Sequence, residues 1–515
     1  MKKPQVNRLL FLMLLIPLGI ILTQLLSPAD TFVAHQQFIP KPLPAFYSGG
    51  LEQGSGGQLE RDWQALDSSN LFTPSQARNS ANALMPSSAY PAPETCGSCH
   101  TTIYANWQRS LHASSATDPA YLAVKELFAF ERGEPAVRLC AGCHAPVALM
   151  TGEVGLYSRE SASSQQGVSC SFCHTVDKSH GGNGAYTSDP SRVRAYLGVP
   201  WSSFHGLSPE TVAKNLESSN GMSLGSTPSS TEASSTASPM PEASSPLEGA
   251  ARWLVYQKPE AHTQDMQSPA LATGAVCQSC HQFTINGVAV QDTWREWQGS
   301  KSAAQGTTCQ GCHFRSSGFP SEQQPGEIAV GRTRADLLAH TLGGGSTTVA
   351  ARGAENVEYL RNSVKLEVLK TGEALEVKVR NTGAGHSIPT GVTDLRELWL
   401  EVTGLDIKGK VVYSSGVPNA AGNLAPEARI FHATLLDAQG RKLERHDIWR
   451  AAKIGVDTRI PADGSRLERF TLPKGVATVR VRLLWRDLPA NFVAWVLKQN
   501  ASSVKTHELL VWEGK

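Results

Sequence analysis

The stretch Cys96-Gly-Ser-Cys99-His100 indicates how this 515-residue chain folds, because its C-x-x-C-H pattern occurs five times. The later copies use the remaining cysteines: Cys140-Ala-Gly-Cys143-His144, Cys170-Ser-Phe-Cys173-His174, Cys277-Gln-Ser-Cys280-His281 and Cys309-Gln-Gly-Cys312-His313. Two thiols three positions apart can form thioethers to the vinyl groups of one haem, and the next residue places an imidazole on its iron. Disulfides or zinc knuckles would not need a histidine after every pair. The pattern therefore predicts five covalently attached haem c groups, with the motif histidines as proximal ligands.

Each iron needs a second axial ligand or keeps an open position, and this choice separates a carrier of electrons from a catalyst. Ten histidines lie outside the motifs. His112 is the first candidate, because Ile103, Trp107 and Leu111 recur every four residues and predict an amphipathic helix that continues from the first motif. Twelve residues of helix rise about 18 Å, so His112 is predicted to reach a neighbouring haem and not its own.

The segment from Cys96 to His112, written C-x-x-C-H-x-x-x-Y-x-x-W-x-x-S-x-H, resembles the opening of multihaem cytochromes c related to hydroxylamine oxidoreductase and to its tetrahaem electron acceptor. Further matches are His262-Thr-Gln-Asp-Met-Gln-Ser-Pro, Thr293-Trp-Arg-Glu-Trp-Gln-Gly-Ser and His340-Thr-Leu-Gly-Gly-Gly. The resemblance spans residues 91–515 with interruptions. It implies that His262 and His340 are distal ligands, and it is more specific for the haem architecture than for a reaction.

Two more distal ligands are predicted from their surroundings. His386 lies in a glycine-rich loop, residues 381–391, whose G-H-x-x-P-T-G element recurs at this point in the resembling cytochromes. We expect it to bind an iron across a domain boundary, with a turn histidine bonded to backbone as the alternative. His205, after Pro200-Trp201, is the fifth predicted ligand, and His180 is a weaker candidate. Three histidines are predicted to be ordinary sheet residues: His432, His446 and His507.

The last third of the chain contains no cysteine and alternates apolar with polar residues. Such runs at 364–368, 375–379, 398–402 and 479–485 predict half-buried strands. We therefore expect a mainly α, loop-rich multihaem cytochrome c domain over residues 91–345, followed by an all-β sandwich over 355–515 resembling immunoglobulin or fibronectin modules. Residues 218–246, rich in Ser, Thr and Pro, are predicted to form a disordered insertion.

The first 90 residues predict export. Lys2, Lys3 and Arg8 precede an uncharged apolar run over residues 9–26, which as a helix would rise about 27 Å, nearly the thickness of a hydrocarbon core. We expect segment 1–30 to be a retained inner-membrane anchor with the rest of the chain on the periplasmic side, and a cleaved signal is the alternative. Residues 31–90 are predicted to form a Pro-, Gly- and Ser-rich tether.

Two functions from different classes are compatible with these features. In the first, five irons each bound by two histidines relay electrons between periplasmic or membrane redox proteins, and no residue is catalytic. In the second, one open haem acts on a small nitrogen or sulfur compound. The first function is favoured because there are enough histidines for every iron. In addition, no C-x-x-C-K variant occurs, whereas the resembling pentahaem nitrite reductases carry a lysine-ligated catalytic haem.

The net charge of +2 gives no electrostatic case for a nucleic-acid partner. The sequence defines neither the donor, the acceptor nor the oligomeric state.

Overall fold

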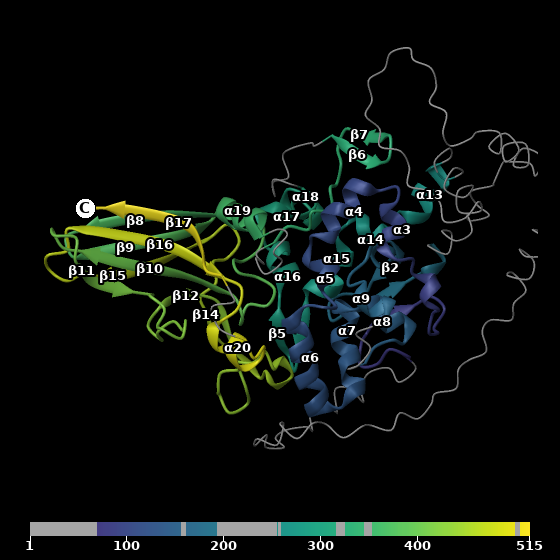
Figure 1. Ribbon diagram of the computed structural model, residues 1–515, viewed down its shortest axis with the longest axis horizontal. Helices are drawn as coiled ribbons and strands as arrows, with labels where there is room; N and C mark the ends of the chain where they lie inside the picture. The colour runs from purple at the N-terminus through teal and green to yellow at the C-terminus, as the bar shows by residue number, and fades with distance from the viewer. Residues whose placement is uncertain are drawn as a thin grey trace, which may run out of the picture. The chain divides into compact units, whose positions relative to one another are not determined.

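The computed structural model describes residues 70–155, 161–192, 255, 259–315, 325–344, 353–499 and 505–515. The predicted anchor, the predicted insertion and His205 lie outside these residues. Figure 1 shows a region of short helices, which carries the five motifs, and a β-rich region, which ends at the C-terminus. No helix in the described part of the chain is long and apolar enough to cross a membrane.

The motif-bearing region consists of short helices joined by loops and small sheets. Its α-helices are α3 (Pro93–Gly97), α4 (Thr101–Gln108), α5 (Leu111–Ser114), α6 (Pro119–Arg132), α7 (Arg138–His144), α8 (Pro146–Thr151), α9 (Ala162–Gln165), α10 (Cys170–Thr175), α13 (Pro259–Met266), α14 (Pro269–Ala272), α15 (Ala275–His281), α16 (Thr293–Gln298), α17 (Lys301–Ala304) and α18 (Cys309–His313). Its 3-10 helices are η2 (Ser87–Ala89), η3 (Glu134–Val137) and η5 (Pro190–Arg192). Its strands form one sheet in the order β1 (Arg78–Asn79), β3 (Tyr186–Ser188), β2 (Val176–Ser179), and the hairpins β4 (Phe283–Ile285) with β5 (Val288–Gln291) and β6 (Gly326–Ala329) with β7 (Arg332–Arg334).

Four of the five motifs each lie within one short helix: α7, α10, α15 and α18. Residues three and four positions apart share a helix face, so each of these helices presents two thiols and an imidazole on the same side. Side chains before the helices fix two of the starts, because Ser169 accepts a hydrogen bond from the Phe172 amide and Thr308 from the Gly311 amide. The first motif differs, since α3 ends at Gly97 and α4 begins only after His100.

The helix predicted to run unbroken from the first motif to His112 is not continuous. Helix α4 ends at Gln108, and His112 lies in a separate one-turn helix, α5. Ser110 begins α5, because its hydroxyl accepts a hydrogen bond from the Ala113 amide at 3.4 Å. The apolar spacing was therefore correct for α4, but the capping serine between the two helices redirects the chain before His112.

The predicted tether of residues 31–90 is also wrong at its C-terminal end. Phe72, Ala77, Met85 and Tyr90 are buried and belong to one apolar cluster with α8, α10 and β3. This stretch consists mostly of small and polar residues, but its few large apolar side chains are sufficient to hold the stretch against the core. The folded part of the chain therefore begins at least 20 residues before the first motif.

The β-rich region begins with a helix. Helix α19 (Gly353–Ser363) precedes β8 (Val364–Thr371), β9 (Ala374–Asn381), β10 (Glu397–Leu405), β11 (Val411–Ser415), β12 (Arg429–Phe431), β13 (Ala433–Leu436), η9 (Ile448–Arg450), β14 (Lys453–Asp457), β15 (Ser465–Thr471), β16 (Thr478–Arg486), α20 (Ala490–Trp495) and β17 (His507–Gly514). The strands predicted from alternation are confirmed as β8, β9, β10 and β16. The all-β expectation is wrong, because α19 packs Val357 and Leu360 into the core of the strands and α20 buries Phe492.

Two antiparallel sheets share that core. One has the strand order β11-β10-β16-β17 with β12 also paired to β10, the other has the order β15-β9-β8, and β13 pairs separately with β14. Leu398 on β10 pairs with Trp485 on β16, and both are buried with Val377 of β9 in one cluster. Apolar side chains from both sheets therefore meet in a single interior.

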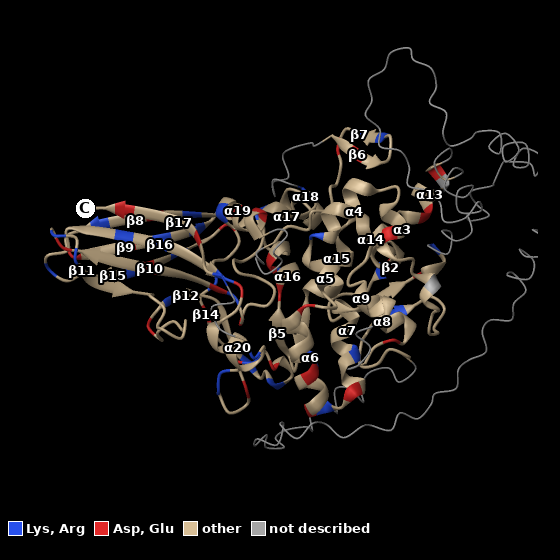
Figure 2. Cartoon of the chain, viewed as in Figure 1, with Lys and Arg blue, Asp and Glu red and all other residues tan. Residues whose placement is uncertain are grey.

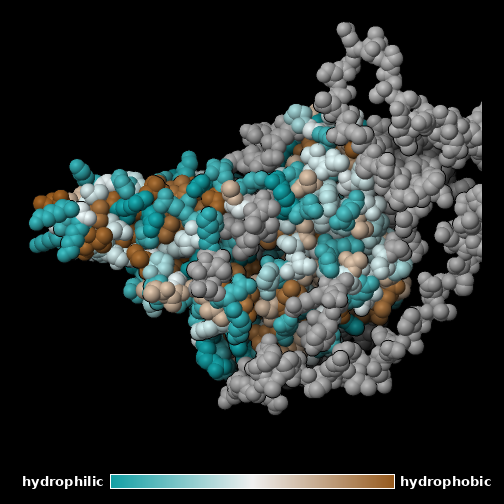
Figure 3. All heavy atoms as spheres, viewed as in Figure 1, coloured by the Kyte–Doolittle hydropathy of each residue, from teal (hydrophilic) through white to brown (hydrophobic). Residues whose placement is uncertain are grey.

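The surface of the described region mixes both signs of charge (Figure 2), in keeping with a net charge of +2. Apolar patches are visible on the β-rich region (Figure 3), and exposed apolar side chains there include Ile407, Val411 and Val412. Isolated surface apolar residues are common in globular proteins, so these residues do not by themselves define a binding surface.

Candidate cofactor-binding site

A continuous cavity of about 2370 Å³ is lined by all ten cysteines and all five motif histidines. That volume exceeds the roughly 300–1,000 Å³ of an ordinary small-molecule site, so it has room for several large groups. The ten cysteines are free thiols. Among the described residues, no cluster of three or more His, Cys, Asp or Glu side chains could hold a bare metal ion. These observations disfavour the disulfide and zinc alternatives.

Each motif is one candidate attachment site, and these sites are numbered in chain order. Site 1 is Cys96, Cys99 and His100; site 2 is Cys140, Cys143 and His144; site 3 is Cys170, Cys173 and His174; site 4 is Cys277, Cys280 and His281; site 5 is Cys309, Cys312 and His313. Burial raises the pKa of Cys140 and of Cys173 to about 12. Thiols in such surroundings are not the thiolates that zinc requires, whereas a neutral thioether suits them.

Four of the five motif histidines face a second histidine across the cavity. The pairs are His100 with His262, His281 with His112, His174 with His340 and His313 with His386, with ring centroids 6.0, 6.1, 6.4 and 6.0 Å apart in that order. A metal bonded to both rings at roughly 2 Å would hold their centroids about 6 Å apart. The spacing of these four pairs therefore fits one iron between the two rings of each.

Hydrogen bonds fix which nitrogen of each ring is free. The Nδ1 atoms of His100, His174 and His313 lie 2.6, 2.9 and 2.6 Å from the carbonyl oxygens of Ile328, Met266 and Gly343. Because a carbonyl only accepts, Nδ1 must carry the hydrogen, and Nε2 is left for a metal. His340 and His386 make the same kind of bond, to the carbonyls of Leu338 and Ser387. Such bonds orient metal-binding imidazoles and make them better ligands.

Burial also keeps these rings neutral. It lowers the pKa of His112 to about 3, and it lowers the pKa of four other histidines to about 4: His262, His281, His313 and His340. Neighbouring imidazoles lower these pKa values further. Only a neutral ring has the lone pair that binds a metal, so the site is prepared for ligation at neutral pH.

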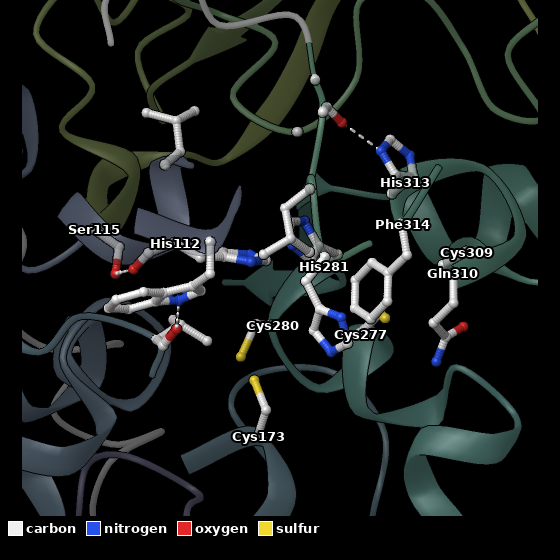
Figure 4. A pocket seen from close by; sticks show the side chains of 18 of the residues that line it. His112, Ser115, Cys173, Cys277, Cys280, His281, Cys309, Gln310, His313 and Phe314 are labelled. Carbon is white, nitrogen blue, oxygen red and sulfur yellow. Dashed lines mark hydrogen bonds between the residues drawn. The ribbon is translucent and has the colours of Figure 1, made fainter. Parts of the chain in front are cut away.

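His112 is held by the loop that precedes site 3. The Val168 amide donates to the His112 carbonyl at 2.9 Å, and the Val168 carbonyl accepts from the Trp107 indole at 2.9 Å. Gly167 permits this approach, since it has a φ of 59° and a Cβ there would stand 2.3 Å from the His112 oxygen. Figure 4 shows His112 reaching into the cavity toward His281 of site 4.

His386 reaches site 5 from the β-rich region, on the connection between β9 and β10. Glu296 of α16 holds this connection, because its carboxylate accepts hydrogen bonds from the Ser387 amide at 3.1 Å and from the Thr390 hydroxyl at 2.8 Å. Arg459 forms an ion pair with the same carboxylate. The β-rich region therefore supplies a side chain to the cavity, and Glu296 positions it.

Site 2 differs from the other four. The described residues contain no histidine that faces His144 at the spacing of the four pairs. Tyr121 stacks on the ring instead, with centroids 4.5 Å apart and planes 8° from parallel. His144 is exposed to the cavity, whereas the other motif histidines are partly buried.

The structure brings the predicted ligands His112, His262, His340 and His386 opposite the other four sites, and His205 lies outside the described residues.

The five sites are close neighbours. Thiols of different motifs lie near enough to shift each other's pKa in three places: Cys96 with Cys170, Cys143 with Cys280, and Cys277 with Cys309. Cys173 and Cys280 also point toward each other (Figure 4). Site 1 therefore adjoins site 3, and site 4 adjoins sites 2, 3 and 5.

Two residues at the cavity have positions or contacts that we did not predict from sequence. Glu296 lies in the quoted segment that begins at Thr293, so the resemblance identified the segment but not the contact. His446 was predicted to be an ordinary sheet histidine, yet it lies in the β13–β14 connection at a φ of 58° and lines the cavity. A histidine in a left-handed turn was the only local signal, and it is visible only in the backbone.

Comparison with known proteins agrees with this geometry. The family model described as cytochrome c554 and c-prime matches residues 95–175. The fold is similar to the crystal structure of a penta-heme cytochrome c552 from Thermochromatium tepidum, at 24% identity and a TM-score of 0.52, over 83% of this chain and 99% of that chain. No curated protein sequence matches the chain significantly. The motifs, the paired histidines and these matches together support a multihaem c-type cytochrome with covalently bound haem c.

Proposed function

We propose that the chain binds five haem c groups and transfers electrons between redox partners. The observation that carries this proposal is the set of four facing histidine pairs in a cavity lined by all ten cysteines. Haem c supplies one-electron redox chemistry when bound. The similar Thermochromatium protein is described as a penta-heme cytochrome, which supports the number five.

The proposed ligand sets follow from the pairs. His262 would complete site 1, His340 site 3, His112 site 4 and His386 site 5. An iron with two imidazole ligands has no position for a substrate, so these four sites suit electron transfer rather than catalysis. The mutual electrostatic influence of thiols of different motifs supports direct transfer from site 1 through site 3 to site 4, and from there to sites 2 and 5.

The surroundings of His144 favour a second candidate function at site 2. No histidine among the described residues faces it, and the cavity continues beside it. We propose that site 2 keeps an open position, where a small nitrogen or sulfur compound could bind. His205 remains the sequence-based alternative as its second ligand.

The partners and the surroundings of the chain are proposals as well. The basic and apolar N-terminal segment supports export, with redox proteins of the periplasm or the membrane as donor and acceptor. The two sheets around one core support an immunoglobulin-like sandwich for the β-rich region. Its function would be to close the cavity with His386 and to offer an outer surface for docking.

The test is a count of haem groups and of electrons on the full-length protein, produced in a host that attaches haem c. Intact-mass spectrometry should show five haem additions, and protein-film voltammetry should transfer five electrons per chain through one electrode contact. A double variant, Cys309→Ala with Cys312→Ala, should lower both numbers to four. Fewer than five haem additions, or sites that the electrode does not reduce, would overturn the relay.

A further inference from the structure

We propose that the β-rich region supplies the distal residue of site 2. This residue is His446, which Asp394 orients so that its Nε2 atom accepts a hydrogen bond from a small ligand bearing an N–H or O–H group. The inference rests on the proposed open position at site 2. It extends that proposal by naming the residue that selects the ligand and the chemical class of the ligand.

His446 is held rigidly beside the cavity. Its Nδ1 atom lies 3.0 and 2.9 Å from the two carboxylate oxygens of Asp394, whose side chain is only 3% exposed. His446 also acts electrostatically on His144, and both rings line the cavity. Tyr121 stacks on the His144 ring, and it comes from α6, the helix to which the His446 connection is also fixed.

The support for His446 comes from both regions of the chain. Its connection, between β13 and β14, is fixed to α6, because the Glu131 carboxylate accepts hydrogen bonds from the Trp449 indole at 2.7 Å and from Arg450 at 2.7 and 3.1 Å. Asp394 lies on the same β9–β10 connection as His386. One segment of the β-rich region therefore positions a ring at site 5 and orients another near site 2.

The Asp394 carboxylate determines what His446 can do. A carboxylate only accepts hydrogen bonds, so in the neutral ring the hydrogen is on Nδ1 and the lone pair is on Nε2. In the described structure Nε2 of His446 has no hydrogen-bond partner of its own. Because His446 lines the cavity, this acceptor is available to a ligand bound there. Water, hydroxylamine and other ligands with N–H or O–H groups can donate a hydrogen bond to this Nε2 atom. An anion that only accepts hydrogen bonds, such as fluoride, cannot.

The test uses the oxidised full-length protein with its haem groups attached, and two variants that act in different ways. His446→Leu removes the acceptor. In the Asp394→Asn variant the side-chain amide can donate a hydrogen bond to Nδ1 of His446. The ring hydrogen then moves to Nε2, and Nε2 becomes a hydrogen-bond donor. Resonance Raman coordination markers report whether site 2 holds a water ligand. A titration with sodium fluoride, monitored by the high-spin optical band, measures fluoride binding.

We expect the wild type to hold water at site 2 and to bind fluoride weakly. His446→Leu should lose the water, and Asp394→Asn should bind fluoride tighter by roughly tenfold, the effect of one ordinary hydrogen bond. Water and fluoride binding that neither variant changes would overturn the role of His446. Fluoride binding that is tight in the wild type and lost in His446→Leu would overturn the acceptor assignment. If the wild type has no high-spin iron, the open site itself is wrong, and this outcome is distinct from the other two.

Discussion

His313 and His386 face each other with ring centroids 6.0 Å apart and planes 11° from parallel, although one ends helix α18 and the other lies between two strands of the β-rich region. A single iron between them would fasten the two regions by a coordinate bond. The β-rich region is therefore part of the cofactor cavity and not an appended module.

Replacing a paired distal histidine should open one iron and leave every haem attached, because the thioethers are independent of that ligand. We expect His112→Ala to gain one high-spin iron per chain in low-temperature electron paramagnetic resonance, with the haem count unchanged. The matched control is His180→Ala, since His180 is exposed and its Nε2 bonds only to the Thr187 hydroxyl, at 2.8 Å. If His112→Ala keeps the wild-type spin states, His112 is not a ligand.

Glu296 should control the ligation of site 5 without touching it. Glu296→Ala removes the acceptor for the Ser387 amide and the Thr390 hydroxyl, so the loop with His386 loses its anchor. We expect a partial high-spin signal from site 5 and a lower melting temperature. Glu376→Ala, which breaks an exposed ion pair with Arg469 on the same region, should change neither. Equal spectra for the two variants would remove Glu296 as a positioning residue.

Glu131 should stabilise the contact between the two regions. Glu131→Gln weakens three hydrogen bonds to Trp449 and Arg450 in a largely buried place, and we expect it to lower the free energy of unfolding by about 2 kcal/mol. The comparison is Glu367→Gln, whose exposed pair with Arg380 should contribute less than roughly 0.5 kcal/mol. Denaturant unfolding of the loaded protein measures both, and a smaller loss for Glu131→Gln than for Glu367→Gln would contradict the assignment.

Site 2 should have a higher reduction potential than sites 1, 3 and 5. In the proposed ligand sets a second neutral imidazole donates electron density to the iron of each of those three sites, whereas no described histidine faces His144. We expect a difference on the order of tens of millivolts. A redox titration monitored by the high-spin signal gives the value for site 2. A midpoint below those of the low-spin sites would contradict this reasoning.

The sequence predicted the chemistry of this chain better than its architecture. The C-x-x-C-H spacing located the residues that line the cavity, because it is a local pattern on single helical turns, and the alternating runs located four strands. Which histidine faces which could not be predicted, since His262 and His386 reach their partners through tertiary contacts. The same reason explains why the position of His446 at the cavity was not predicted. The break at Ser110 has a local cause, since a serine cap is a recognisable signal that the apolar spacing alone does not take into account.

The most direct test of the central claim is quantitative low-temperature electron paramagnetic resonance of the oxidised full-length protein, with His205→Ala measured beside the wild type. The account predicts four low-spin irons and one high-spin iron per chain, the same in both proteins. Five low-spin irons in the wild type, with a high-spin iron gained only in His205→Ala, would contradict the open site and show that His205 completes site 2.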